Sequence, residues 1–173
     1  RARVAGAPTP TPSVVDTWIM PKTLTSTVHH LVDLRFVGET PEGQRVMIDN
    51  ERRARTGMSP MQLLLNATAA CAAMDVVVML GKRKLTVNAY RVEITGERPD
   101  ANPAPFERLK ARHVFDVPGL DRATAERFVQ LATEKYCSVG LSLKASIDYA
   151  VASEPAEGRA PARLRPAPGR GPA

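Results

Sequence analysis

Apolar residues occupy every face of the stretch from Ser59 to Gly81, SPMQLLLNATAACAAMDVVVMLG, which predicts one long helix enclosed by other structure. Ser59 can cap the start of this helix, and Pro60 suits its first position. Gly81 and the basic residues after it supply a stop. A membrane span would need roughly 20 nearly unbroken apolar residues, and polar side chains interrupt this stretch, so a core helix is the favoured interpretation.

The polar and apolar positions before this helix alternate as they do in strands. The segment from Thr23 to Asp49 contains TLTSTVHHLVDLRFVG and QRVMID, separated by turn residues at Glu39–Gly43. We expect an antiparallel meander of two or three strands there.

A second group of strands is predicted after the long helix. Thr86–Glu97 alternates, with Tyr90 and Ile94 on one side and Arg91 on the other. Leu109–Val117 alternates again beyond a Pro-rich connection. The two segments are therefore expected to pair as an antiparallel hairpin.

A second helix is predicted to follow Pro118-Gly119. Asp121 is its expected N-cap, and apolar residues recur at helical spacing to form a buried stripe. The members of that stripe are Ala125, Phe128, Val129, Ala132 and Tyr136. The helix should end near Cys137, and a last short strand is expected at Ala145–Val151.

The order of elements predicts an α+β domain over residues 23–151 with less regular flanks. Residues 1–22 are rich in Pro, Ala and Thr and predict an extended arm. Residues 152–173 contain Pro, Ala, Gly, Arg and Glu without periodicity and predict a disordered tail. A chain of 173 residues is long enough to bury a core without disulfides or metals.

The net charge of +6 does not indicate nucleic-acid binding. The flanks 1–21 and 151–173 carry +1 and +2, which leaves +3 for residues 22–150. Nucleic-acid binding normally needs a concentrated basic face, often with aromatic residues, and only 5% of this chain is aromatic. Two cysteines are too few for a secreted disulfide framework, so we expect a cytoplasmic location and no membrane partner.

Two further features suggest chemistry only weakly. His29 and His30 are adjacent, but neighbours in a strand point to opposite faces and cannot easily share one metal ion. We therefore expect no metal site. The loop Asn50–Met58 carries three arginines and is interpreted as a solvated connector rather than an anion-steering element.

The two thiols are the remaining candidates for chemistry. Cys71 lies about three turns from the start of the long helix, where the helix dipole no longer favours a thiolate, and Cys137 ends the second helix. Ionisation of Cys71 would need a nearby cation, and Asp75 one turn away opposes it. The alternative is structural, since free cysteine often serves as a small buried hydrophobe.

The motifs around these cysteines resemble those of the OsmC/Ohr family of stress-linked thiol proteins, particularly its OsmC-like bacterial subgroup. The resemblance covers about Leu31 to Val151, or about 70% of the chain. It rests on SPMQLLL, AAC and MDVV within Ser59–Val77, and on FVGE at Phe36–Glu39, GER at Gly96–Arg98 and EKYCSV at Glu134–Val139.

The resemblance implies an intertwined homodimer in which two antiparallel sheets pack around two central helices. It also implies a thiol peroxidase that reduces organic hydroperoxides without a cofactor. Cys71 matches the residue that peroxide oxidises to sulfenic acid, and Cys137 matches the residue that then forms a disulfide with it. A dithiol reductant would reset the pair.

The sequence departs from the family pattern in the first turn of the long helix. Peroxidase members carry a glutamate there that holds an arginine against the thiolate, but this chain has Met61, followed by Gln62. Candidates for the arginine are Arg35, Arg45, Arg52, Arg53 and Arg55. The departure favours an alternative function, a non-catalytic module that binds a hydrophobic small molecule in the dimer cleft.

Overall fold

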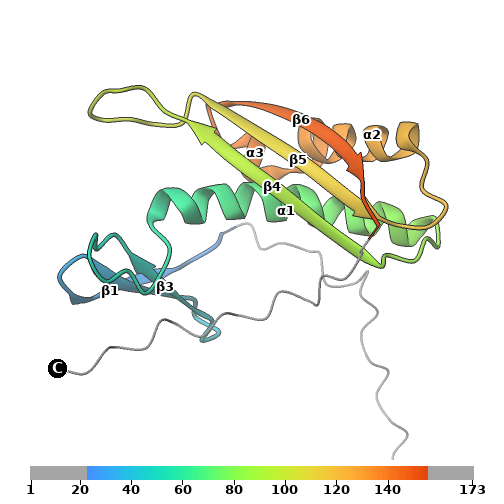
Figure 1. Cartoon of the computed structure of the whole chain (residues 1–173). Coiled ribbons are helices and arrows are strands. Elements are labelled where there is room, and N and C mark those ends of the chain that lie inside the picture. Colours follow the sequence, from blue (N-terminus) through green and yellow to red (C-terminus); the bar gives the residue numbers. More distant parts are fainter. Residues whose placement is uncertain (1–22, 156–173) are drawn as a thin grey trace, which may run out of the picture. The chain divides into compact units, whose positions relative to one another are not determined.

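The computed structural model describes residues 23–155, which divide after Gly57 into two compact units (Figure 1). Each unit contains one three-stranded sheet, and all the helices of the described residues lie in the second. The predicted α+β class is therefore confirmed. The expected arm at 1–22 lies outside the described residues, as does the expected tail from residue 156 onward.

The first unit is the antiparallel meander that the alternation predicts. Tight turns join its strands, and the backbone is left-handed at Asp33 (φ 52°) in the first turn and at Gly43 (φ 89°) in the second. Glycine takes that conformation at no steric cost, which explains its place in the turn. The strands are β1 (Thr27–Val32), β2 (Arg35–Glu39) and β3 (Arg45–Asp49).

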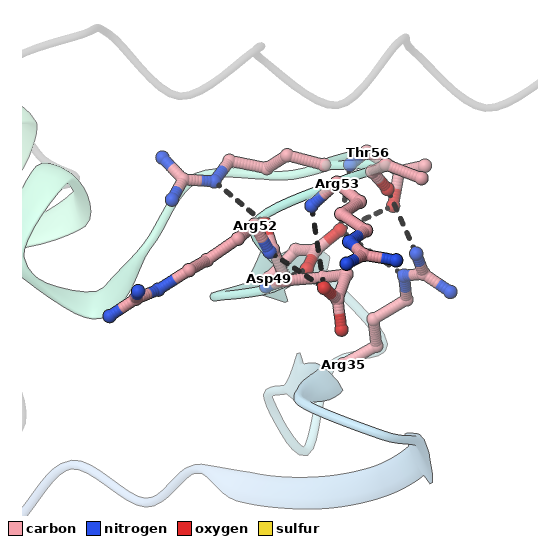
Figure 2. Close-up of polar contacts among 8 residues, drawn as sticks. Arg35, Asp49, Arg52, Arg53 and Thr56 are labelled. Carbon is pink, nitrogen blue, oxygen red and sulfur yellow. Dashed lines mark hydrogen bonds and ion pairs between the residues drawn. The ribbon is translucent and has the colours of Figure 1, made fainter.

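A buried carboxylate organises the loop that leaves β3, as Figure 2 shows. Asp49 accepts hydrogen bonds from the backbone N–H groups of Glu51 and Thr56, both at 2.7 Å, and from the Thr56 hydroxyl at 2.9 Å. The Nε of Arg35 donates a fourth at 3.3 Å. The Thr56 N–H is the largest cause of a pKa well below the usual aspartate value, so Asp49 is ionised.

The second unit combines a long helix, a three-stranded sheet and a shorter helical segment. Its helices are α1 (Pro60–Lys82), α2 (Arg122–Leu131), the π-helical turn η1 (Ala132–Tyr136) and α3 (Ser138–Leu141). Its strands are β4 (Ala89–Glu97), β5 (Arg108–Asp116) and β6 (Ser146–Ser153).

The ends of α1 follow mostly local rules. Ser59 caps the helix and Pro60 opens it, as predicted. The stop lies beyond Gly81, because the helix continues to Lys82 and Lys84 takes the left-handed conformation (φ 56°). Leu85 N–H then bonds to Leu80 O and Lys84 N–H to Gly81 O, which is a Schellman motif with lysine where glycine is usual.

The core of the second unit lies between its helices and one face of its sheet. Val76 and Leu80 of α1 pack with Phe115 of β5 and with Val129 of α2, and all four are almost completely buried. The stripe predicted for the second helix is confirmed except at Tyr136, which is 48% exposed. The π-helical turn alters the helical spacing just before Tyr136, so this side chain leaves the buried stripe.

The second sheet differs from the expected antiparallel arrangement at one strand. Strands β4 and β5 form the predicted antiparallel pair, but β6 pairs with β5 in parallel. The intervening α2, η1 and α3 supply the long crossover that a parallel pair requires. Strand β6 also runs to Ser153, two residues beyond the predicted end of the domain.

The outward face of this sheet carries a ring of charges that includes a residue predicted to lie in the tail. Arg91 and Arg112 each pair with both Glu93 and Glu154, at N–O distances of 2.7–3.0 Å. Glu154 thus joins the end of β6 to β4 and β5. The polar outer face and apolar inner face explain the alternation in the sequence.

Candidate functional site

The structure brings both cysteines into the second unit, in helical segments that pack on each other. Cys71 lies midway along α1 and is half-buried, whereas Cys137 follows η1 and is completely buried in the apolar core. Cys71 packs against the cluster that contains Cys137. Both are free thiols. Two residues 66 positions apart therefore share one apolar environment.

Cys137 is held by polar contacts to both of its helical neighbours. As the N-cap of α3, its sulfur accepts a hydrogen bond from the Gly140 N–H at 3.2 Å. The thiol donates to the carbonyl oxygen of Thr68 in α1 at 3.8 Å. The sulfur thus lies against the α1 turn that precedes Cys71. A side chain at position 140 would meet this sulfur at about 3.3 Å, so glycine allows the close approach.

Burial keeps the Cys137 thiol protonated. Loss of hydration raises its pKa to about 11, with smaller upward contributions from the neighbouring Cys71 and from Asp75. The Gly140 N–H acts in the opposite direction. The pKa of Asp75 is itself raised by partial burial. Both thiols therefore lie at α1, within one apolar cluster.

All five candidate arginines lie in the first unit, and several already have partners there. Arg35 binds Asp49 and the Ala54 carbonyl oxygen at 2.8 Å. Arg45 pairs with Glu39 at 2.9 Å, and Arg55 donates to the Glu51 carbonyl. Within residues 23–155 the Arg52 and Arg53 side chains have no hydrogen-bonding or ionic partner (Figure 2). Of the five candidates, these two exposed guanidinium groups are therefore the most available to bind an anion.

The first turn of α1 uses its polar residue for capping. The side chain of Gln62 accepts a hydrogen bond from the Ser59 N–H at 2.9 Å, while the Ser59 hydroxyl accepts one from the Gln62 N–H. This reciprocal pair is a capping box. The turn contains no acidic residue, and Met61 is half-buried. Gln62 therefore stabilises the helix end, and its amide oxygen is already occupied.

The histidines of β1 behave as separate strand residues. His29 lies 3.7 Å from Glu39, and His30 Nε2 is 3.1 Å from the Asp33 carbonyl oxygen; both side chains are exposed. Among residues 23–155, no three metal-binding side chains are grouped to hold an ion.

One buried polar residue of the second unit was not predicted from the sequence. His113 is completely buried, with its Nδ1 2.6 Å from the Tyr90 hydroxyl. It occupies an inward position of β5, where the neighbouring inward residues Ala111 and Phe115 are apolar. A histidine on the apolar side of an alternating strand was the available signal.

The fold and the site together define an α+β protein whose second unit places two free thiols in one apolar cluster, one buried and one half-buried. The chain matches the model of the OsmC-like protein family over residues 52–152. It is also 33% identical over 115 residues to Protein YhfA of Escherichia coli, an alignment that covers 66% of this chain and 85% of YhfA. The chain therefore belongs to the OsmC-like family.

Solved structures share the fold at lower sequence identity. An OsmC-like protein from Mycoplasma pneumoniae superposes with a TM-score of 0.67 at 17% identity, over 78% of this chain and 99% of that one. An organic hydroperoxide resistance protein OsmC from Legionella pneumophila gives 0.53 at 18% identity, over 76% and 96%. These likenesses establish the fold alone.

Helix α1 is long and apolar enough to cross a membrane by composition. In the OsmC-like fold, which is a soluble one, it is a core helix instead, and its Val76 and Leu80 are completely buried.

Proposed function

We propose that this protein is a thiol-dependent peroxidase that reduces organic hydroperoxides through Cys71 and Cys137. The observation that carries the proposal is the pair of neighbouring free thiols in one apolar core. Family membership and the name of the Legionella relative, an organic hydroperoxide resistance protein, support it. Half-buried Cys71 is the sulfur that a substrate can reach, while buried Cys137 is protected from direct attack.

The cycle balances in three steps. The Cys71 thiolate attacks the hydroperoxide, an S–O bond replaces the O–O bond, and a proton converts the departing alkoxide to an alcohol. The Cys137 thiol then loses its proton and attacks the Cys71 sulfenic acid as a thiolate. An S–S bond replaces the S–O bond, and the departing hydroxide takes up the proton to become water. An external dithiol, such as a lipoyl group, reduces this disulfide to two thiols and becomes a disulfide itself.

A homodimer is part of the proposal. The sequence of α1 is apolar on all faces, yet its buried residues form one stripe, and Met74 and Val77 remain 53% and 47% exposed. Tyr136 and Leu141, close to Cys137 in sequence, are exposed as well. A second copy over these side chains would close the apolar surroundings of the thiols. Light scattering that gives the mass of a monomer at micromolar concentration would contradict it.

Peroxide consumption tests the activity directly. The parent, Cys71→Ser and Cys137→Ser proteins are each given an organic hydroperoxide and dihydrolipoamide. We expect the Cys71→Ser protein to lose turnover completely, because no sulfenic acid can form. The Cys137→Ser protein should give one rapid turnover and then stall. Full activity in the Cys71→Ser protein would show that the mechanism is wrong.

A disulfide provides the second test. After one equivalent of hydroperoxide and digestion without reductant, mass spectrometry should find Cys71 and Cys137 joined within one chain. Retention of both free thiols would exclude this pathway, whatever the rate of peroxide loss. The reducing cycle also fits the cytoplasmic location that we propose.

The second candidate is a binding module for an apolar small molecule. The capping role of Gln62 favours it, because neither Gln62 nor Met61 can orient an arginine as the family glutamate does. The thiol pKa of Cys71 separates the two functions. An unactivated Cys71 should titrate near or above ~8.5, whereas a peroxidatic thiolate requires a lower value.

A further inference from the structure

A small cavity lies inside the second unit beside the buried thiol. Helix α1, the turn η1 and strands β4, β5 and β6 line it with mostly apolar side chains, and its volume is about 10 Å³. Cys137 forms part of the wall. A volume of roughly 10–15 Å³ is the least that accommodates one water molecule, provided that polar groups are present to bind it. The size therefore limits an occupant to a single small molecule.

Two polar atoms in the wall have no partner among residues 23–155. His113 Nε2 and Thr133 Oγ1 are both fully shielded, and neither has a hydrogen-bond partner among residues 23–155. Both residues line the cavity. An unpaired polar atom in the interior costs roughly 1–3 kcal/mol, so two in one small cavity point to a common partner.

The hydrogen bond on the other ring nitrogen of His113 sets the direction of donation. The Tyr90 phenol is protonated, since burial raises its pKa, and its oxygen lies 2.6 Å from His113 Nδ1. Burial also lowers the pKa of His113 to about 4, so the imidazole is neutral at physiological pH. If the phenol donates to Nδ1, the ring proton resides on Nε2. Nε2 is then a donor into the cavity.

We propose that this cavity binds one water molecule, which accepts hydrogen bonds from His113 Nε2–H and Thr133 Oγ1–H and donates one to the Cys137 sulfur. Tyr90 is the positioning residue that fixes the donor tautomer of His113. A water that accepts two hydrogen bonds directs its own protons away from those donors. The acceptors in the remaining wall are the Cys137 sulfur and the Thr68 hydroxyl oxygen.

The water would help the Cys137 sulfur to carry negative charge. On the protein side, the Gly140 N–H donates to this sulfur, whereas the Thr68 carbonyl offers only an acceptor that a thiolate cannot use. Among titratable neighbours, Cys71 and Asp75 of α1 oppose ionisation, and His113 is neutral. Tyr149 of β6 donates its hydroxyl to Glu134 of η1, so these two satisfy each other.

This inference rests on the proposed function in one respect, that Cys137 reacts with a sulfenic acid as its thiolate. Its test uses no peroxide and is independent of turnover. The thiol pKa of Cys137 is measured from the pH dependence of the 13Cβ chemical shift of labelled cysteine. The full-length Cys71→Ser variant is used, so that the signal comes from Cys137 alone. The 15N shifts of the three histidines are recorded on the same samples.

The decisive variant is Thr133→Val, which removes one donor at constant side-chain volume. We expect the pKa of Cys137 to rise by about one unit, the effect of losing one hydrogen bond to a charged group. Thr68→Val is the matched control. Thr68 lines the same cavity, but its hydroxyl already donates to the Leu64 carbonyl oxygen at 2.8 Å, so the pKa should stay within about 0.2 of the parent.

Two further variants separate hydrogen bonding from packing. Thr133→Ser retains the donor and should restore the parent pKa. Tyr90→Phe removes the phenol that fixes the ring, so the 15N spectrum should lose the pure Nε2–H tautomer of His113 and the Cys137 pKa should rise. The proposal is overturned if the parent spectrum shows an Nδ1–H tautomer, or if Thr133→Val and Thr68→Val shift the pKa equally.

Discussion

The two units of this protein bury different kinds of side chain. In the second unit, apolar residues such as Phe115, Leu80 and Val129 fill a core between the helices and the sheet. Among residues 23–155, several large side chains are fully buried. Only one of these belongs to the first unit, and it is the carboxylate of Asp49. In the sheet of the first unit, Val28 is 58% exposed and Val46 is 45% exposed. One unit is stabilised mainly by apolar burial, whereas the other depends on satisfied polar groups.

This difference indicates where the protein tolerates change. A closed apolar core loses free energy whenever a methylene group is removed, because neighbouring atoms cannot refill the space. Truncation of a half-exposed strand residue costs little free energy, because the side chain has few contacts within its own chain. The proposed chemistry of the second unit depends on that core, since both thiols pack in it and burial raises the pKa of Cys137.

Truncation of core residues should give the largest effect. Leu80→Ala removes a completely buried side chain and should lower the free energy of unfolding by roughly 3–4 kcal/mol. Val28→Ala in β1 should change it by less than about 0.5 kcal/mol. Urea denaturation followed by circular dichroism measures both. Equal losses in the two variants would remove the contrast between the units.

Histidine protonation gives the next largest effect. His113 has a folded pKa of about 4 against 6.5 when unfolded, so the unfolded state binds more protons between these values. The stabilisation is fully present above pH 6.5 and is lost as the pH falls toward 4, on the order of 2–3 kcal/mol. His113→Gln should flatten this part of the stability profile.

The loop of the first unit should respond to loss of the Asp49 charge. In Asp49→Asn the amide keeps the shape but replaces one acceptor oxygen with a donor, so the Thr56 N–H and hydroxyl lose a partner. We expect amide exchange at Glu51 and Thr56 to accelerate by about tenfold or more, with α1 unaffected. Because the pKa of Asp49 is strongly lowered, the parent loop should keep its protection below pH 4. Hydrogen exchange is followed by mass spectrometry. Equal exchange rates of this loop in the parent and in Asp49→Asn would contradict the prediction.

The smallest predicted effect is a gain at the end of α1. Lys84 is left-handed, a conformation that glycine adopts without steric cost. Lys84→Gly should raise the free energy of unfolding by about 0.5–1 kcal/mol. Lys82→Gly, two residues earlier and inside the helix, should lower it by a similar amount. A loss in both variants would mean that the Schellman geometry at Lys84 is wrong.

Local patterns predicted most of the elements because each depends on neighbouring residues. Ser59 and Asp121 cap their helices as expected, and Tyr90 lies on the inner side of β4. The prediction failed at Tyr136, where a π-helical turn alters the spacing, and at β6, whose parallel pairing depends on the length of the crossover before it. Such features arise from packing between distant segments.

The sequence by itself determined the helices, most strand limits and the two cysteines as the candidate chemistry, since periodicity and capping act over a few residues. Only the tertiary structure decided that Cys71 and Cys137 are neighbours, that Gln62 is occupied by capping, and that His113 and Thr133 line the cavity beside Cys137. The physical reason is that burial depends on the whole fold. Burial sets the pKa values of Cys137 and His113 and makes an unpaired polar atom costly, and no short stretch of sequence specifies it.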